Sequence, residues 1–272
     1  MMYQALTIAG SDSGGGAGIQ ADLKTFGLCG VFGTSVITAI TAQNTKGVFD
    51  IHQIPPKTIT SQLHAVVDDF SIKACKIGML GDVASIQAVY DFLVQHKASV
   101  GKLIIDPVMI AKGGANLLQE NAVTALIKLL PLADVITPNI PEAQVLTGLS
   151  ISDDDSLQLA IDKLHQMGIK GVIIKGGHRD DEWCRDWVSV GGSRFFVEQR
   201  RILQSGTHGT GCSFSACLTA QLAKGVPMMD AIKDAKAFIT HAIANPIKVG
   251  GGINPVNHWA GADAIKARKH LL

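Results

Sequence analysis

Short apolar segments alternate along this chain with longer segments whose apolar residues recur every three or four positions. The segments at residues 102–106 (KLIID) and 171–175 (GVIIK) are apolar throughout, which is typical of central strands buried on both faces. Because parallel strands need a crossover between them, this alternation predicts an α/β fold with a mostly parallel sheet and helices on both faces.

The same patterns give approximate bounds for each element. We expect strands over residues 3–9, 35–42, 47–54, 76–79, 102–106, 134–137, 171–175, 183–190 and 194–198. We expect helices over residues 18–29, 58–70, 83–96, 120–130, 141–147, 152–167, 210–224 and 228–245, with Thr58 and Ser152 as two of the helix caps.

Length and composition favour a single folded domain over residues 1–272. Hydrophobic residues make up 47% of the chain and charged residues 17%, which is enough for a sizeable core. The formal net charge of +1 gives no electrostatic basis for binding nucleic acid or an anionic membrane. The chain has no run of about 18 apolar residues, and its five cysteines include no C-x-x-C pair. We therefore expect a cytoplasmic protein with free thiols.

Polar residues and glycines follow four of the predicted strands. Residues 10–18 (GSDSGGGAG) follow the first of these strands. Three later strands end in or are followed by polar residues, which are Asp106 at 102–106, Asn139 and Glu142 after 134–137, and Lys175 at 171–175. A lone polar residue after a strand is usually solvated, but parallel strands bring their carboxyl ends to one edge, where ligands bind. Carboxylate and amide oxygens suit Mg²⁺ together with phosphate oxygens, and a lysine there neutralises phosphate charge. We therefore expect one ligand site at this edge.

Two common nucleotide-binding motifs do not account for this edge. Residues 16–21 (GAGIQA) fit the G-x-G-x-x-A form of the dinucleotide fingerprint, but no acidic residue that would hold the ribose lies between Leu23 and Phe49. The P-loop pattern G-x-x-x-x-G-K-[ST] is absent from the sequence. A nucleotide bound at this edge must therefore be held by another arrangement.

A second glycine loop, Gly209-Thr210-Gly211, stands at the start of a predicted helix and is followed by Cys212. Backbone N–H groups at a helix start bind anions, and glycine lets the backbone approach them closely. The same positive potential favours a thiolate, so Cys212 is a candidate for handling a proton beside a phosphate. The alternative is that Cys212 only packs in the core, as we expect for Cys217.

Eight segments in a fixed order make a more specific pattern. They begin at Ala9 (AGSD), Gly15 (GGAGIQADLK), Thr41 (TAQNT), Lys76 (KIGML), Asp106 (DPVM), Thr137 (TPNIPEA), Lys175 (KGGH) and Thr207 (THGTGC). Together they closely resemble the hydroxymethylpyrimidine/phosphomethylpyrimidine kinases of thiamine biosynthesis, which belong to the ribokinase-like superfamily. The resemblance extends from about residue 5 to about residue 258.

The resemblance implies a ribokinase-like three-layer sandwich that binds ATP and Mg²⁺ at the carboxyl ends of its strands. It implies two successive phosphorylations, first of 4-amino-5-hydroxymethyl-2-methylpyrimidine and then of its monophosphate. The expected partners are therefore small molecules. Residues 47–54 alternate like a strand exposed on one side, and because exposed edge strands tend to be covered, we expect a flap or a homodimer contact there.

By matching position, the resemblance also assigns roles to individual residues. Gln43 suits its role because its amide both donates and accepts hydrogen bonds toward an aminopyrimidine. In sugar kinases of the superfamily an aspartate that takes the hydroxyl proton occupies the position of Cys212, and Lys112 is expected on a loop covering the transferred group. The expected sets are Gly10, Asp22, Gln43, Met79 and Val108 for the pyrimidine; Asp106 and Glu142 for Mg²⁺; Lys175, Asn139 and Thr207 for the nucleotide; and Cys212, Gly209, Gly211 and Lys112 for the transfer.

Two alternative functions stay open, and the chain departs from the family pattern at two places. Some related pyridoxal kinases share the cysteine at position 212, so a pyridoxal or pyridoxine kinase is the nearest alternative, and a non-catalytic nucleotide-binding regulator is a more distant one. The family usually has a lysine and a second glycine within residues 249–255, where this chain has Gly251 and Asn254. Gly14 also stands where the family commonly has serine.

Overall fold

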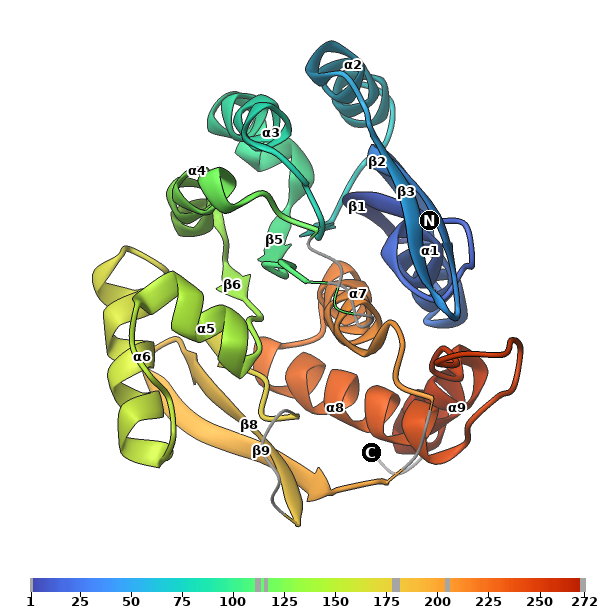
Figure 1. Cartoon of the computed structure of the whole chain (residues 1–272), viewed down its shortest axis with the longest axis vertical. Coiled ribbons are helices and arrows are strands. Elements are labelled where there is room, and N and C mark those ends of the chain that lie inside the picture. The colour runs from blue at the N-terminus through green and yellow to red at the C-terminus, as the bar shows by residue number, and fades with distance from the viewer. Residues whose placement is uncertain (1, 111–113, 115–116, 178–181, 204–205, 270–272) are drawn as a thin grey trace.

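A mostly parallel sheet forms the centre of the chain. The computed structural model describes residues 2–110, 114, 117–177, 182–203 and 206–269. Within these residues, nine strands form one sheet in the order β3-β2-β1-β4-β5-β6-β7-β8-β9. Strands β1, β2, β4, β5, β6 and β7 run parallel, whereas β3, β8 and β9 pair antiparallel at the two edges. This confirms the predicted α/β architecture (Figure 1).

The elements follow the predicted order with adjusted ends. The strands are β1 (Gln4–Asp12), β2 (Phe32–Asn44), β3 (Gly47–Gln53), β4 (Ala74–Ile77), β5 (Lys102–Ile105), β6 (Val135–Ile136), β7 (Val172–Ile174), β8 (Trp183–Val190) and β9 (Ser193–Arg200). The helices are α1 (Gly18–Leu28), α2 (Pro56–Val67), α3 (Val83–His96), α4 (Val123–Leu129), α5 (Ile140–Thr147), α6 (Asp154–Gln166), α7 (Thr210–Ala223), α8 (Met228–Ala244) and α9 (His258–Lys269). None of the helices in the described part of the chain has the length and apolar character needed to cross a membrane.

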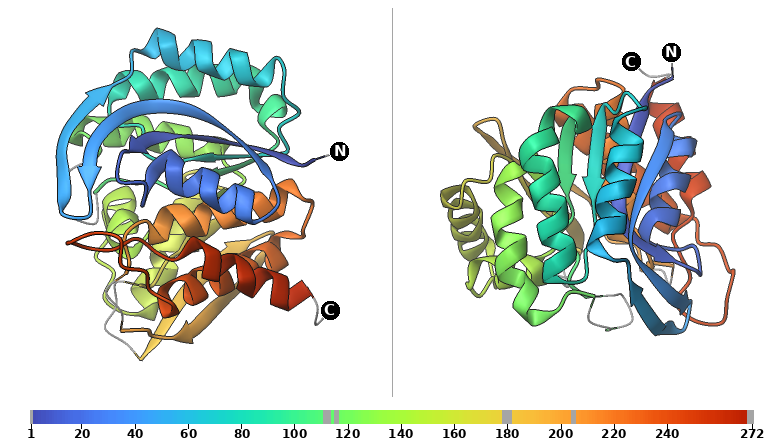
Figure 2. Two further views of the ribbon diagram at one scale, coloured as in Figure 1. Left: turned by 90° about the vertical axis from the view of Figure 1, so that its right-hand side faces the viewer. Right: turned by 90° about the horizontal axis from the view of Figure 1, so that it is seen from above.

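Alternate residues of the buried strands pack on opposite faces of the sheet. On β5, Leu103 and Ile105 join the hydrophobic cluster that includes residues of α2 to α6, whereas Ile104 joins the cluster that includes residues of α1, α7, α8 and α9. This is the two-residue period of a strand that is buried on both sides. The helices therefore form a layer on each face of the sheet (Figure 1 and Figure 2).

Helices α2, α4, α5 and α6 begin at other residues than predicted, and for α2 and α6 the predicted cap differs as well. Helix α2 begins at Pro56, so Thr58 lies inside its first turn. Proline suits a first helical position because its φ is already helical and it has no N–H to leave unpaired. Helix α6 is capped by Asp153 rather than Ser152, because Asp153 Oδ1 accepts the backbone N–H of Ser156 at 2.8 Å. Both predicted caps are therefore wrong.

A ninth helix, α9, lies beyond the two helices that were expected to end the fold. Its residues Ala262 and Ile265 are buried in the same cluster as Phe238 of α8. A Cβ at Gly261 would lie 2.9 Å from three atoms of the Phe238 ring, so glycine permits this close packing. Glycine also has a low helix propensity, which weakens the helical signal in the sequence.

The β2–β3 hairpin contacts the segment at residues 249–255. The hairpin reaches past the ends of the neighbouring strands (Figure 2). At its tip, the carbonyl oxygen of Thr45 accepts the N–H of Ile253 at 2.7 Å. The next residue of the segment, Asn254, bonds to the loop before α7, where its carbonyl oxygen accepts the N–H of His208 at 3.1 Å. The segment that departs from the family pattern therefore connects the hairpin tip with the loop before α7.

The cap of α6 gives a test of the local structure. Replacing Asp153 with Ala should lower the free energy of unfolding by about 1 kcal/mol, because the N–H of Ser156 would lose its acceptor. Replacing Ser152 with Ala should change it by less than about 0.5 kcal/mol. Urea unfolding of both variants and the wild type at pH 7 measures the two effects, and equal losses would contradict the assignment of Asp153 as the cap.

Candidate active site

A cavity of about 590 Å³ lies at the carboxyl ends of the parallel strands. Its wall is formed by residues at or after the ends of β1, β4, β5, β6 and β7, by the start of α7, and by parts of β8, β9 and α8. Open α/β sheets bind their ligands at this edge. The predicted site residues that line the cavity are Gly10, Gln43, Met79, Asp106, Val108, Asn139, Glu142, Lys175, Thr207, Gly209, Gly211 and Cys212. Their individual roles stay predictions, and Lys112 lies outside the described residues.

The loop before α7 presents a helix start to this cavity. Gly209 is the N-cap residue, and its φ of 78° is left-handed. A Cβ at this position would lie 1.8 Å from the carbonyl oxygen of Gly16, so both the backbone conformation and the contact require glycine. The Thr210 hydroxyl donates to the carbonyl of Thr207 at 2.7 Å and closes the loop. The N–H groups of the first turn and the helix dipole make this a suitable site for an anion.

Cys212 lies in the first turn of α7 and is partly exposed in the cavity. The backbone N–H of Gly18 donates to its sulfur. Burial raises the pKa of the thiol; Lys76 opposes this shift, whereas the carboxylates of Asp22 and Asp106 add to it. The expectation that the helix start would favour a thiolate is therefore wrong in this environment, and Cys212 is a protonated thiol at neutral pH.

Beneath the cavity wall lies a buried ion pair between Lys76 and Asp22. Lys76 Nζ donates to both carboxylate oxygens of Asp22, at 2.7 and 2.8 Å, and the Thr7 hydroxyl donates to the same carboxylate at 2.6 Å. Lys76 lines the cavity, but Asp22 is fully buried and is not among the lining residues. The structure thus brings Asp22 to Lys76 rather than into the cavity. No role was predicted for Lys76, although a lysine inside a short apolar strand signals a buried partner.

A second ion pair joins the ends of β5 and β7. Lys175 Nζ lies 2.7 Å from Asp106 Oδ1, which also accepts the Thr137 hydroxyl at 3.0 Å, and Asp106 Oδ2 accepts the Ser215 hydroxyl at 3.3 Å. Burial alone would raise the pKa of Asp106, but Lys175 and Lys76 hold it below its ordinary value. Burial would likewise lower the pKa of Lys175, but Asp106 raises it. Both groups are therefore charged at neutral pH.

Asn139 and Glu142 form the capping box of α5. Asn139 Oδ1 accepts the N–H of Glu142, and Glu142 Oε2 accepts the N–H of Asn139, both at 2.8 Å. Burial raises the pKa of Glu142 to about 7; Lys175 opposes this shift, and the negative charge of Asp106 adds to it. Glu142 is thus a buried carboxyl group that a cation in the cavity would stabilise in its charged form.

Comparisons with known proteins show the family to which the chain belongs. The model of the family described as phosphomethylpyrimidine kinase matches residues 12–257. A hydroxymethylpyrimidine/phosphomethylpyrimidine kinase from Haemophilus influenzae is 63% identical over 262 residues, which cover 94% of this chain and 97% of that protein. The chain belongs to the phosphomethylpyrimidine kinase family. This confirms the family and the kinase class that the ordered sequence segments indicated.

Solved structures of this family and of related kinases share the fold. A phosphomethylpyrimidine kinase from Clostridium difficile 630 aligns with a TM-score of 0.78 and 43% identity, covering 89% of this chain and 99% of that one. Pyridoxal kinase from Bacillus subtilis, solved as an ADP complex, aligns with a TM-score of 0.87 and 39% identity, covering 96% of this chain and 98% of that one. The ribokinase-like fold is therefore common to phosphomethylpyrimidine kinases and pyridoxal kinases.

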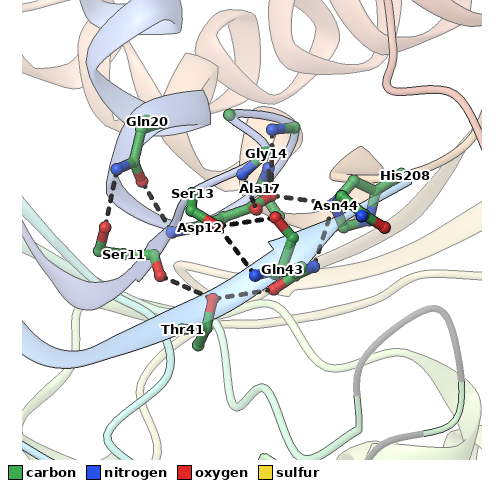
Figure 3. A network of polar contacts seen from close by, with 12 residues as sticks. Ser11, Asp12, Ser13, Gly14, Ala17, Gln20, Thr41, Gln43, Asn44 and His208 are labelled. Atoms are coloured by element: carbon green, nitrogen blue, oxygen red, sulfur yellow. Dashed lines mark hydrogen bonds and ion pairs between the residues drawn. The ribbon is translucent and has the colours of Figure 1, made fainter. Parts of the chain in front are cut away.

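This member of the phosphomethylpyrimidine kinase family also has a polar network that sequence reasoning missed. Asp12 accepts backbone N–H groups from Gly14, Gly16 and Ala17 at 2.8 to 3.0 Å, and His208 Nε2 lies 3.0 Å from Asp12 Oδ2 (Figure 3). The network joins the glycine loop after β1 to the loop before α7. The sequence gives little signal for it, because Asp12 and His208 are 196 residues apart.

The raised pKa of Glu142 predicts a pH-dependent stability. In the unfolded chain a glutamate titrates near pH ~4.3, whereas folded Glu142 titrates near pH 7. Between these values the folded state binds the additional proton, so stability falls as pH rises. This group should lower the free energy of unfolding by on the order of 2 kcal/mol between pH 5 and pH 7.5.

The variant Glu142→Gln should lack this contribution, because glutamine retains the capping bond without a titrating proton. Denaturant unfolding of wild type and variant, without Mg²⁺ or nucleotide, measures the difference at several pH values. Other titrating groups cancel in that difference, so parallel curves for the two proteins would contradict the raised pKa.

Proposed function

We propose that this cavity transfers the γ-phosphoryl group of ATP to the hydroxymethyl oxygen of 4-amino-5-hydroxymethyl-2-methylpyrimidine, and then a second phosphoryl group to the monophosphate. The observation that carries the proposal is the meeting of a helix start suited to an anion, the partly buried cation Lys175 and Cys212 in one cavity. The 63% identical relative is named for both phosphorylations, and the related pyridoxal kinase was solved with ADP.

The protein's part in such a transfer is positioning and charge stabilisation. Phosphoryl transfer passes through a loose transition state in which negative charge spreads over the transferred group. The N–H groups at Gly209 and Gly211 would hold these oxygens, and Lys175 would neutralise charge on the nucleotide phosphates. Lys175 keeps its proton for this task because Asp106 raises its pKa. Asn139, whose Oδ1 already caps α5, would offer its amide N–H₂ to the nucleotide.

Two carboxylates fit a Mg²⁺ ion bound together with the nucleotide. No group of three or more His, Cys, Asp or Glu side chains suited to a metal occurs within the described residues. Asp106 and Glu142 both line the cavity, and one or two carboxylates with phosphate oxygens are the usual Mg²⁺ ligands. When bound, the ion would neutralise phosphate charge. Its presence would also favour the charged form of Glu142, whose pKa is raised to about 7 by burial.

Cys212 would orient the substrate hydroxyl rather than act as a strong base. Burial raises the pKa of its thiol, so it carries its own proton when the substrate arrives. In a loose transition state the hydroxyl keeps its proton until late, so a weak partner suffices to direct it. We propose direct transfer without a phosphocysteine, because a thiol with a raised pKa is a poor nucleophile.

Replacing Cys212 with Ala tests this role on the two steps separately. The variant should lower kcat/KM for the pyrimidine alcohol by about 10- to 100-fold, because the hydroxyl loses its partner. For the monophosphate the loss should stay below about 3-fold, because that acceptor oxygen is already deprotonated. Steady-state assays of ADP release with each substrate measure both values. Equal losses on the two substrates would show that Cys212 does not act on the hydroxyl.

Pyridoxal kinase is the second candidate, because a solved pyridoxal kinase shares the fold over 96% of this chain. Parallel assays with MgATP and the pyrimidine alcohol, its monophosphate or pyridoxal distinguish the two functions. We expect the highest kcat/KM with the pyrimidine alcohol. Faster turnover of pyridoxal would favour the second candidate, whereas turnover of none of the three would favour a nucleotide-binding regulator.

We also propose that β3 lies at a homodimer contact in the cytoplasm. It is an edge strand, and Phe49 on β3 and Ile40 on the adjacent β2 expose 67% and 50% of their surface. Such strands are usually covered. All five cysteines lie in the described part of the chain, and none of them forms a disulfide there, which fits a reducing compartment. The molar mass in solution should fall from dimer to monomer on replacing Phe49 with Glu, as measured by light scattering, and a monomeric wild type would contradict the contact.

A further inference from the structure

The Gln43 side chain lies between Thr41 and His208 at the cavity wall (Figure 3). Its amide Oε1 lies 3.2 Å from Thr41 Oγ1, and its amide Nε2 lies 3.3 Å from His208 Nε2. The backbone of Gln43 is fixed independently, because its N–H donates to the Ser13 hydroxyl at 2.8 Å and its carbonyl accepts that hydroxyl at 2.7 Å. With the side chain in this position, a half-turn of the amide about its last bond exchanges oxygen and nitrogen.

The contact with Thr41 determines which end of the amide belongs on that side. The Thr41 hydroxyl has one proton, and it donates this proton to the carbonyl oxygen of Ser11 at 2.8 Å. Toward Gln43 the hydroxyl therefore presents only lone pairs. The amide N–H₂ of Gln43 can donate to such a lone pair, whereas the lone pairs of the amide oxygen would be repelled by it. The contact favours the orientation in which nitrogen faces Thr41.

The contact with His208 leads independently to the same orientation. His208 Nε2 lies 3.0 Å from Asp12 Oδ2, which is a carboxylate that also accepts backbone N–H groups from Gly16 and Ala17. An ionised carboxylate only accepts, so His208 Nε2 must carry the hydrogen. This one hydrogen is donated to Asp12, so toward Gln43 the ring nitrogen offers no lone pair. The amide nitrogen of Gln43, 3.3 Å away, would therefore set two N–H donors against each other, whereas the amide oxygen would face the N–H without this conflict.

In this orientation Gln43 retains one N–H donor and its oxygen acceptor for a ligand. An amide has two N–H groups and two oxygen lone pairs; Thr41 accepts one N–H, whereas His208, whose hydrogen is donated to Asp12, takes up neither lone pair. The oxygen then lies on the side of His208, which directly precedes Gly209 in the loop that would hold the transferring phosphoryl group. The nitrogen lies on the side of Thr41, away from that loop.

The order of acceptor and donor on the Gln43 amide is complementary to the hydrogen-bonding edge of one pyrimidine ring but not to that of its close analogue. In 4-amino-5-hydroxymethyl-2-methylpyrimidine the amino donor stands next to the hydroxymethyl group, and the ring acceptor N3 follows. With the hydroxymethyl at the loop, the amino group meets the Gln43 oxygen and N3 meets its N–H. The 4-oxo analogue presents an acceptor and then an N–H donor, so both contacts are reversed.

We infer that Thr41 and His208, the latter held by Asp12, are positioning residues that fix the amide of Gln43 and thereby select a 4-aminopyrimidine over a 4-oxopyrimidine. This inference rests on the proposed function. A freely turning amide would accept either ring by rotating half a turn. The network prevents this. In a turned amide the oxygen would face the lone pairs of Thr41, and the nitrogen would face the N–H of His208.

The experiment measures kcat/KM of the wild type and variants with the 4-amino substrate and its 4-oxo analogue. The wild type should prefer the amino substrate by about 100-fold or more, because two hydrogen bonds to the ring are mismatched in the analogue. Thr41→Val and His208→Phe should each reduce this preference by about 10-fold, because each removes one of the two contacts that hold the amide. Thr41→Ser retains the hydroxyl and should keep the wild-type preference.

A matched control is Thr34→Val, which makes the same change at the other end of β2. The Thr34 hydroxyl is also buried and donates to a carbonyl, that of Ala5, at 3.1 Å. This variant should lose stability without changing the preference, and thermal melting shows whether each variant is folded. A general structural defect lowers the rates with both substrates, but it does not change their ratio.

The outcomes separate this inference from the proposed function. Failure of the wild type to phosphorylate the amino substrate would overturn the proposed function. A wild type that phosphorylates it but accepts the oxo analogue equally well would overturn the inference alone. So would a preference that stays unchanged in both Thr41→Val and His208→Phe, because the amide would then be held by other groups.

Discussion

The contact between two glycine loops positions the other groups of the site. Gly209 caps α7 in a left-handed conformation, and its Cα is so close to the carbonyl oxygen of Gly16 that no Cβ fits between them. The loop that contains Gly16 follows strand β1, and the loop that contains Gly209 precedes helix α7. The first belongs to the proposed recognition of the ring and the second to the proposed phosphoryl transfer. The loop after β1 forms the wall beside Gln43, and the loop before α7 offers its N–H groups to an anion. Their contact sets the distance between ring recognition and phosphoryl transfer.

The same convergence of strand ends concentrates charge in a region with little water. Two lysine–aspartate pairs lie there, the buried pair of Lys76 with Asp22 and the partly buried pair of Lys175 with Asp106. Within each pair the two charges neutralise one another. Glu142 has no cation of its own at hydrogen-bonding distance in the described structure, and burial raises its pKa to about 7. Among the described residues, the side where the carboxylates meet has one more negative than positive charge once Glu142 is ionised. The metal ion of a metal–nucleotide complex brings a compensating positive charge, which couples binding of the ion to ionisation of the protein.

The sequence predicted the parts of the fold that follow from regular spacing. Strand alternation gave the sheet, and the rule that parallel strands end at one edge brought Asp106 to the cavity wall, as expected. Three features that residue spacing does not encode were not predicted. Helix α9 depends on Gly261 packing against an aromatic ring, and a glycine looks like a helix breaker in isolation. The ionisation of Cys212 depends on burial and distant carboxylates, and the Asp12–His208 contact joins residues 196 positions apart. Only the folded chain brings such groups together.

The fold itself does not determine the substrate of this enzyme. A pyridoxal kinase superimposes on the chain with a TM-score of 0.87, so the sheet, the helices and their order are compatible with a different vitamin alcohol. The groups that bind phosphates, such as the helix start at Gly209, do not contact the ring of the alcohol substrate, so they do not distinguish one ring from another. Discrimination must come from groups that face the ring and are themselves held in one orientation. An amide alone is ambiguous, because its two ends exchange by rotation. It becomes selective only where fixed neighbours such as Thr41 and His208 satisfy one orientation and oppose the other.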